Sequence, residues 1–477
     1  MKHFSIIFVL VILVVFASTS YAQIDSTLAQ QLQDTLDYVC SLKNIKGAST
    51  AVVMPDQEIW TGVNGITHDT VKIKPGMLFG IASITKNYTA LLILKLAEEG
   101  ILTLEDSLHE WLPTYNNIDS TITIRQLLNM TSGIYDYVND NPSFGDSLFS
   151  DLSRAWTPEE IITKLVGPPH FPPGTMFRYS QTNYILLGMI IKKATGSSIS
   201  DELRNRFFNP LNLNATFFSG EDTLIGEIAH PNPYYNGSFH DYYFMLGAAN
   251  SSLLWTGGAM FATAQDVAQW AKALFGGAVL NQYYTNQMVT FGPISHPSPL
   301  PPEWTGYGLG AYQFNILNRE LWGGVGLWWG YVALVAYLPG DGISIAVLLN
   351  ERYDGSVNFT MRNAHDILAA LLGTVIDYVS DVEVDNTDLP FNYILKQNYP
   401  NPFNPSTTFE FALPHSGFVT LKVYNIMGEE VVTLVSERLT AGSYKYDWNA
   451  NGLASGVYVY KFQTSDYIET KKIILLR

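Results

Sequence analysis

Apolar and polar positions follow two different rhythms along the first three quarters of the chain. Apolar residues recur every three to four positions, and a glycine follows, in three segments typical of amphipathic helices: 84–99, 184–195 and 266–275. Apolar, β-branched and glycine-bounded runs typical of buried strands come later: 306–314, 330–339 and 342–350. Helices in the middle and strands near the end predict an α+β fold, not a regular alternation of strands and helices.

The pattern changes after residue 375. Residues 376–393 are acidic, lack a period and include Pro390, so we predict that they form a linker. From 394 to 477, short alternating runs are separated by Gly, Pro and Asn turns, which predicts a small all-β sandwich. The chain therefore divides into an α+β domain at 23–375, a linker, and a β domain at 394–477.

The first 22 residues have the three parts of a secretory signal peptide: a short basic start, an apolar run and the small-residue cleavage site Ser20-Tyr21-Ala22. The apolar run is shorter than the roughly 20 residues that span a bilayer, and an uncleaved anchor is the alternative. The residue directly after the predicted cleavage site is Gln23 and not a cysteine, so we expect no lipid anchor. The mature chain keeps only Cys40, which excludes an internal disulfide. We expect no other membrane span.

The composition of this 477-residue chain disfavours some classes of binding partner. Apolar residues make up 47%, enough for a sizeable core, and the net charge is −16. A chain this acidic is a poor ligand for nucleic acid or an anionic membrane, because both are themselves negatively charged.

Ser83 and Lys86 stand three residues apart in an apolar helical segment, on one helix face. A serine hydroxyl is a weak nucleophile and needs a base nearby. A buried lysine with a lowered pKa, or one that holds a tyrosine as phenolate, can supply that base. This is the one Ser-x-x-Lys in the chain, so its context decides whether it is functional.

That context resembles the serine β-lactamase and penicillin-binding superfamily, in its class C, D-alanyl-D-alanine carboxypeptidase and family VIII esterase branch. The matching stretches, in order, are GIASITKNYTALLILKLAEEGILTLEDSLHEWLP, TITIRQLLNMTSGI, PPGTMFRYSQTNYILLGMIIKKATG and GGAMFATAQDVAQWAKAL. Met130 sits where a histidine is common. The resemblance covers about 27–372 and implies an antiparallel sheet flanked by helices, with a helical subdomain.

The resemblance places Tyr179 as the catalytic tyrosine beside Ser83 and Lys86. Gln181 departs from the usual asparagine, but it keeps the amide that would bind substrate. Strict Tyr-x-Asn also occurs at Tyr115, Tyr234 and Tyr284. We prefer Tyr179, because a Pro-Gly turn precedes it and a Leu-Leu-Gly helix follows.

The third motif of the family, usually Lys-Thr-Gly or His-x-Gly, corresponds to LWGGVGLWWGYVALVAYLP. Trp322, Gly323 and Gly324 resemble the Trp-Gly-Gly version of family VIII esterases and are the expected substrate-binding residues. A second register puts Gly324 where the histidine sits. Either register lacks a cation, whose charge-assisted bond to a substrate carboxylate is worth roughly 1.5–3 kcal/mol. Without the cation, a substrate that lacks the carboxylate no longer binds more weakly than one that carries it.

The resemblance also implies an oxyanion hole of two backbone N–H groups, those of Ser83 and Val325, or Leu327 in the second register. No cofactor or metal is needed. His109-Glu110 lacks the second histidine of a zinc helix, and the glycine-rich runs lack the βαβ unit of a dinucleotide site. Trp328 and Trp329 either line an acyl pocket or pack in the core.

The tail contains YPNPFNPSTT, LKVYNIMGEEVVTLV, LASGVYVYKF and a basic end, and it resembles the C-terminal sorting domain of type IX secretion. That resemblance implies export by the type IX machinery, with the protein extracellular or on the outer cell surface. A carbohydrate-binding or packing module of similar shape is the alternative.

These observations favour a secreted serine hydrolase that forms an acyl-enzyme on Ser83 and acts on small carboxylic esters. A close alternative keeps the machinery but acts on D-alanyl peptides or β-lactams. A non-catalytic surface protein that binds peptidoglycan or peptides is an alternative of another class.

Overall fold

The computed structural model describes residues 24–294, 303–353, 357–385, 393–413, 417–439, 442–464 and 467–476. The predicted signal peptide lies outside these residues. The chain divides into two compact units, Met1–Val375 and Ile376–Arg477, which are described separately.

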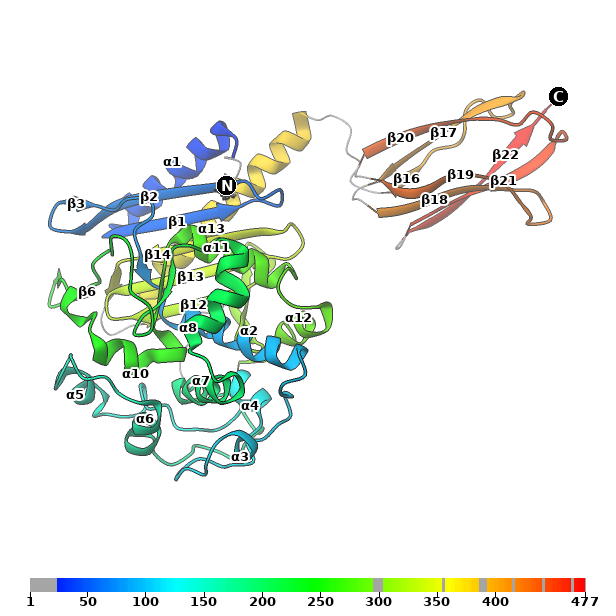
Figure 1. Ribbon diagram of the computed structural model, residues 1–477. Coiled ribbons are helices and arrows are strands. Elements are labelled where there is room, and N and C mark those ends of the chain that lie inside the picture. The colour runs from blue at the N-terminus through cyan, green and yellow to red at the C-terminus, as the bar shows by residue number, and fades with distance from the viewer. Residues whose placement is uncertain are drawn as a thin grey trace, which may run out of the picture. The chain divides into compact units, whose positions relative to one another are not determined.

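An antiparallel nine-stranded sheet forms the centre of the first unit, in the order β3-β2-β1-β14-β13-β12-β11-β10-β9 (Figure 1). Its strands are β1 Gly47–Val53, β2 Ile59–His68, β3 Val71–Lys72, β9 Gly292–Pro293, β10 Trp304–Tyr307, β11 Tyr312–Ile316, β12 Arg319–Trp328, β13 Tyr331–Leu338 and β14 Ile343–Leu349. Every residue of β1, β13 and β14 is buried, as expected for central strands covered on both faces.

Two small three-stranded sheets lie beside the large one. The first contains β4 Phe79–Gly80, β5 Thr216–Phe218 and β8 Met260–Ala262; the second contains β6 Asn232–Tyr235, β7 Ser238–Phe239 and β15 Glu351–Tyr353. The β4 strand leads directly into the segment that carries Ser83, so its pairing with β8 fixes where that segment begins.

Helices cover the sheet and build the helical subdomain. They are α1 Ser26–Lys43, α2 Thr85–Glu98, α3 Leu108–Trp111, α4 Ile124–Leu128, α5 Phe144–Phe149, α6 Pro158–Leu165, α7 Gln181–Thr195, α8 Ile199–Leu203, α9 Asn209–Leu211, α10 Ala248–Gly258, α11 Ala264–Phe275, α12 Gln282–Met288 and α13 Val357–Asp385, with single turns η1 Ala82–Ile84, η2 Arg204–Phe208 and η3 Tyr243–Met245. Thr35 of α1 and Thr374 of α13 share a hydrogen bond of 2.9 Å, so these helices lie side by side. In Figure 1, α2, α7 and α10 lie on the other side of the sheet.

The α+β prediction is confirmed, and the three expected helices correspond to α2, α7 and α11 within a few residues. Glycines stop the first two as predicted, since Gly100 and Gly196 adopt φ of 72° and 71°. The run 306–314 was expected as one strand, but it forms β10, a turn and β11. Gly310 supplies the left-handed φ of 83° that the turn requires.

The expected linker at 376–393 differs from the structure in its first part. Helix α13 continues to Asp385, and residues 386–392 lie outside the described residues. No glycine or proline occurs between Gly373 and Pro390, so nothing in the sequence breaks the helix before that point.

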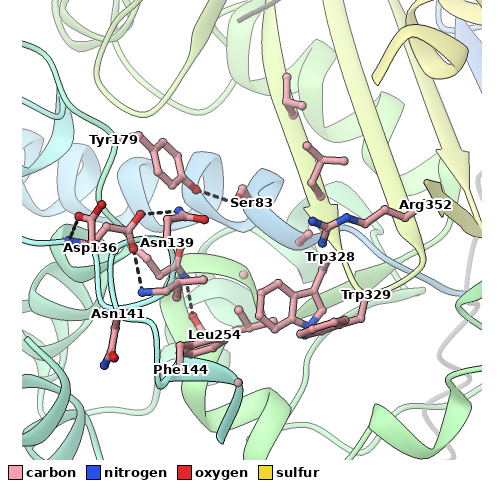
Figure 2. A pocket seen from close by; sticks show the side chains of 18 of the residues that line it. Ser83, Asp136, Asn139, Asn141, Phe144, Tyr179, Leu254, Trp328, Trp329 and Arg352 are labelled. Atoms are coloured by element: carbon pink, nitrogen blue, oxygen red, sulfur yellow. Dashed lines mark hydrogen bonds between the residues drawn. The ribbon is translucent and has the colours of Figure 1, made fainter. Parts of the chain in front are cut away.

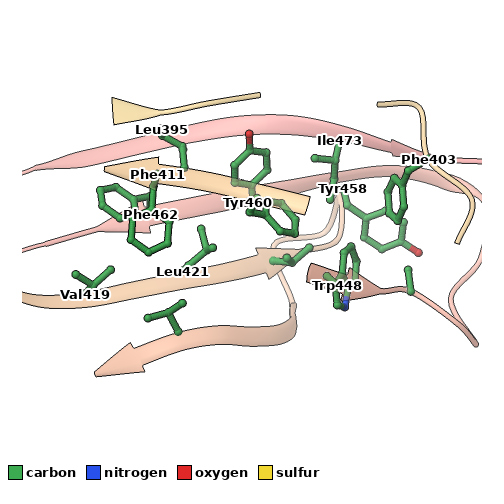
Figure 3. Packing of buried hydrophobic residues seen from close by; sticks show 14 of the residues in the cluster. Leu395, Phe403, Phe411, Val419, Leu421, Trp448, Tyr458, Tyr460, Phe462 and Ile473 are labelled. Atoms are coloured by element: carbon green, nitrogen blue, oxygen red, sulfur yellow. The ribbon is translucent and has the colours of Figure 1, made fainter. Parts of the chain in front are cut away.

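Beyond the end of α13, the second unit is an all-β sandwich, as predicted. One sheet has the order β16-β17-β20 and the other β19-β18-β21-β22. The strands are β16 Ile394–Leu395, β17 Ser406–Leu413, β18 Gly417–Tyr424, β19 Glu430–Leu439, β20 Gly442–Asn449, β21 Gly456–Gln463 and β22 Ile468–Leu475. Figure 3 shows their inward side chains, among them Phe411, Leu421, Tyr460 and Phe462, packed as one core.

Trp270 tests how the core supports α2. It is fully buried on α11, and its ring stacks on Tyr88 of α2 with 3.9 Å between centroids. We expect Trp270→Ala to lower the free energy of unfolding of this unit by about 3–5 kcal/mol, because it leaves a large cavity. Urea unfolding measures this, with the exposed Tyr38→Ala as a control that should change stability by less than about 0.5 kcal/mol. Equal effects of the two changes would contradict the prediction.

Candidate active site

Ser83 lies in the single turn η1 between strand β4 and helix α2. The preceding residue, Ala82, adopts a left-handed φ of 45°, which is uncommon outside glycine and marks a constrained backbone. The half-buried serine hydroxyl lies at the wall of a cavity.

Lys86 occupies the first turn of α2 and is only 2% exposed. Its Nζ lies 3.0 Å from Ser83 Oγ, 2.6 Å from Gln181 Oε1 and 2.6 Å from the Gly257 carbonyl oxygen. Burial lowers the pKa of Lys86 to about 7, and the Asp136 carboxylate opposes that shift. A neutral amine with two N–H bonds donates both to these carbonyl oxygens, and its lone pair then faces the serine hydroxyl.

Tyr179 completes the cluster from a distant part of the chain. Its hydroxyl lies 2.7 Å from Ser83 Oγ, and Lys86 Nζ lies 4.9 Å from the centre of its ring. Burial raises the pKa of Tyr179 well above its ordinary value, which favours a phenol over the phenolate that the sequence left open.

Hydrogen bonds to the loop 135–140 hold the residues on either side of Tyr179. Thr182 Oγ1 donates to the Tyr135 carbonyl over 2.6 Å. Next to the tyrosine, Arg178 bonds to Asp140 over 2.8 Å, and the same carboxylate bonds to His170 over 2.8 Å. The loop 135–140 therefore fixes the backbone on either side of Tyr179.

Met130, where the resemblance expected a histidine, lies behind this segment. Its sulfur accepts the Ser180 backbone N–H at 3.4 Å and approaches Asn183 Nδ2 at 3.5 Å. The thioether sulfur is thus a weak acceptor for these two N–H groups.

Gln181 lies at the start of α7 and uses both ends of its amide inside the protein. Its oxygen accepts from Lys86, and its nitrogen donates to the Leu254 carbonyl over 3.1 Å. The amide that the sequence assigned to substrate therefore orients the lysine in this structure.

A cavity of about 850 Å³ opens over Ser83 (Figure 2). Besides Ser83, its wall includes six residues named from the sequence, namely Tyr179, Gln181, Val325, Leu327, Trp328 and Trp329. The rest is largely aromatic or polar: Asp136, Asn139, Asp140, Asn141, Phe144, Phe177, Arg178, Tyr235, Tyr242, Trp304, Tyr312 and Arg352. Trp328 and Trp329 thus line the cavity while remaining half-buried.

The structure places the expected Trp-Gly-Gly residues away from the cavity wall. The Trp322 ring packs on Phe275 and Phe291, and a Cβ on Gly324 would meet Asn87. Side chains alternate along a strand, so Trp322 and Gly324 share the face of β12 that packs on helices. Gly323 is equally enclosed, since a Cβ there would meet the Val335 carbonyl.

Sequence reasoning missed the backbone of α10 and part of the cavity wall. The carbonyls of Leu254 and Gly257 contact Gln181 and Lys86, and no residue type encodes such a role. Asp136 could have been found from the sequence, because it lies two positions after the Thr-Ser-Gly-Ile landmark. Arg352 comes from β15, far along the chain, and had no recognisable signal.

The described residues contain no group of three or more His, Cys, Asp or Glu side chains arranged to hold a metal ion. In the same part of the chain, none of the helices combines the length and apolarity needed to cross a membrane.

Comparison with known proteins assigns both units. A family model described as "Beta-lactamase" matches residues 27–369, and one described as "Secretion system C-terminal sorting domain" matches residues 397–476. Protein flp of Staphylococcus aureus (strain COL) is 34% identical over 197 residues, which cover 40% of this chain and 38% of that protein. The chain thus matches well under half the length of this relative.

Two solved structures resemble the first unit along nearly their whole length. A D-stereospecific amidohydrolase from Streptomyces sp. is 28% identical with a TM-score of 0.60, covering 70% of this chain and 97% of its own. The D-amino acid amidase from Ochrobactrum anthropi SV3, complexed with L-phenylalanine amide, is 25% identical with a TM-score of 0.65, covering 74% and 99%. With the family match over 27–369, these findings show that the chain belongs to the β-lactamase family and ends in a secretion system C-terminal sorting domain.

Proposed function

We propose that this protein is a serine hydrolase that forms an acyl-enzyme on Ser83 and prefers carboxylic esters. One observation carries the proposal: Lys86 Nζ has two carbonyl acceptors at 2.6 Å and the serine hydroxyl at 3.0 Å. As Ser83 Oγ attacks the ester carbonyl, its proton passes to the lysine lone pair.

Tyr179 delivers a proton to the leaving alcohol. Its hydroxyl is 2.7 Å from Ser83 Oγ, and its raised pKa keeps it protonated at rest. The phenol gives its proton to the alkoxide and is reprotonated by the Lys86 ammonium, which restores the neutral amine. Water then attacks the acyl-enzyme and releases the acid.

For the oxyanion hole we favour the N–H groups of Ser83 and Leu327, which is the second register. β12 lies close against the nucleophile segment at Gly326, where a Cβ would lie 2.1 Å from the Ile81 carbonyl oxygen. The peptide from Gly326 to Leu327 is therefore near the residues that lead into Ser83. Two such donors stabilise the charge that develops on the carbonyl oxygen.

Gly326→Ala tests this register. We expect at least about a 100-fold loss in kcat, because the methyl group meets a backbone oxygen and β12 must move away from Ser83. Gly324→Ala should cost less, since its methyl meets the Asn87 side chain and not a backbone atom. Steady-state kinetics on p-nitrophenyl butyrate measure both; a larger loss at Gly324 would support the first register.

The pH dependence of kcat/KM tests the role of Lys86. Below its pKa of about 7 the lysine is an ammonium and accepts no proton. We therefore expect kcat/KM for p-nitrophenyl acetate to rise with pH through about 7 and to level off above it. Ser83→Ala controls for background hydrolysis, and a flat profile between pH 5 and 9 would exclude Lys86 as the base.

The preference for esters rests on the third motif. Gly324 stands where the resemblance places a cation, and the buried Asn87 side chain fills the adjacent space. The β12 part of the cavity wall is apolar, with Val325, Leu327 and Trp328. A carboxylate beside the scissile bond gains no charged partner from this strand.

Amide hydrolysis is the second candidate. It is supported by the solved relatives at 25% identity or more, which are named an amidohydrolase and an amidase. An amide needs a stronger proton donor for its leaving nitrogen than an ester needs for an alcohol, and Tyr179 lies in position for either.

Substrate profiling separates these candidates. We expect kcat/KM for p-nitrophenyl butyrate to exceed that for nitrocefin and for D-phenylalanine amide. The carboxylate of nitrocefin gains no charged partner from β12, and the amide has a poorer leaving group than the ester. A higher value on D-phenylalanine amide would make the protein an amidase, and a higher value on nitrocefin a β-lactamase.

Mass spectrometry distinguishes an enzyme from the non-catalytic alternative. A fluorophosphonate should add to Ser83 in the native chain but not in Lys86→Ala, and a penicillin should leave little adduct. Absence of any adduct on the native chain would favour a peptidoglycan- or peptide-binding protein.

Export forms the last part of the proposal. The sorting-domain match at residues 397–476 supports delivery by a secretion machinery to the cell surface or beyond. The substrate is then a small ester met outside the cell.

A further inference from the structure

Helix α10 is broken at Trp255, directly beside the active site. This residue has φ of 31° and ψ of −127°, a left-handed conformation that a bulky side chain rarely adopts. A straight helix directs its backbone carbonyls along its own axis. The break turns the carbonyls around Trp255 away from that axis.

Four carbonyls around the break accept hydrogen bonds from side chains of the site or its support. We call them the carbonyl cradle: Leu253, Leu254, Thr256 and Gly257. Their donors are, in order, the Tyr137 hydroxyl, Gln181 Nε2 at 3.1 Å, Thr89 Oγ1 at 2.7 Å and Lys86 Nζ at 2.6 Å.

The Trp255 side chain is fixed by its surroundings. Trp255 is 8% exposed, its Nε1 donates to Glu221 over 3.2 Å, and Lys192 Nζ lies 5.9 Å from the centre of its ring. It packs on Gly188 of α7, where a Cβ would lie 2.7 Å from the indole. Strained backbone persists only where the surroundings determine it, and here a buried ring does so.

The break also ties α10 to the helix that carries Gln181. Thr256 Oγ1 donates to the Tyr184 carbonyl of α7 over 2.7 Å, while Thr89 of α2 donates to the Thr256 carbonyl. The cradle therefore joins α2 and α7, the two helices whose first turns hold Lys86 and Gln181.

We propose that Trp255 is a positioning residue for the catalytic lysine: its left-handed backbone, held by the buried indole, aims the Leu254 carbonyl at Gln181 and the Gly257 carbonyl at Lys86. The inference rests on the proposed function, in which Lys86 acts as the base. With both N–H bonds of the neutral amine committed to fixed acceptors, its lone pair has one direction left, toward Ser83.

Two substitutions of Trp255 separate backbone geometry from packing. Trp255→Ala and Trp255→Gly remove the same indole and differ by one methyl group. Glycine adopts a left-handed conformation readily, whereas alanine favours the regular helix. If the break positions the lysine, the glycine variant keeps more activity, although glycine is the poorer helix former.

The measurement is the inactivation of each variant by a fluorophosphonate, resolved into the maximal rate and the half-saturating concentration. We expect Trp255→Ala to lower the maximal rate about 100-fold with little change in half-saturation, and Trp255→Gly to stay within about tenfold of the native chain. Equal losses, or a faster alanine variant, would reduce Trp255 to a packing residue and overturn the proposal. So would two variants that both react at the native rate.

Thr89→Val supplies an independent arm if the Trp255 variants do not fold. It removes the donor to the Thr256 carbonyl without changing α10, and we expect about a tenfold loss in the maximal rate; an unchanged rate would overturn the proposal. A folded glycine variant beside an unfolded alanine variant supports the left-handed requirement, and the reverse contradicts it. A native chain that never reacts refutes the proposed function itself, whereas a reactive native chain with the wrong order of variants refutes only the role of Trp255.

Discussion

The amine of Lys86 is buried against two carbonyl oxygens and one hydroxyl, and much of the first unit serves to hold that arrangement. Burying a lysine disfavours its charged form, so a neutral amine is available close to neutral pH. The same burial removes water that would compete for the lone pair. Gln181 from α7 and Gly257 from α10 then fix its orientation. In the proposed mechanism, desolvation provides the base and hydrogen bonding orients it.

The remaining parts of the site divide between rigid and irregular structure. Ser83 and Lys86 lie at the start of a helix whose residues are nearly all buried, and Tyr179 is held by the 135–140 loop. The cavity wall instead draws on loop residues such as Asn139, together with Tyr242 and Arg352. Chemistry thus sits on the packed framework, while the groups that meet the rest of a substrate lie on segments that tolerate change.

Much of this was predictable from sequence because it is encoded locally. The apolar period of α2, α7 and α11 and their glycine stops predicted the helices, and alternation predicted the C-terminal sandwich. The spacing of Ser83 and Lys86 pointed to a pair on one helix face, and the family resemblance added Tyr179; the structure brings these three side chains together.

The rest depends on contacts that no local pattern carries. The carbonyls of Leu254 and Gly257 reach the site because a helix breaks at Trp255, and a broken helix has no sequence signature. Our choice of register for the third motif rests on which glycine approaches the Ile81 backbone, a property of two packed segments. Helix α13 passed into the expected linker because acidity alone does not end a helix.

The distance along the chain between the groups around Lys86 has a consequence for reactivity before folding is complete. Gln181 and Gly257 lie 95 and 171 positions away from the lysine, so an unfolded chain leaves the amine in water. There it keeps an ordinary pKa near 10.4 and carries a proton at neutral pH. In the proposed mechanism, Ser83 is therefore unreactive in an unfolded chain and becomes reactive only when the tertiary structure forms. Folding itself is then the activating event.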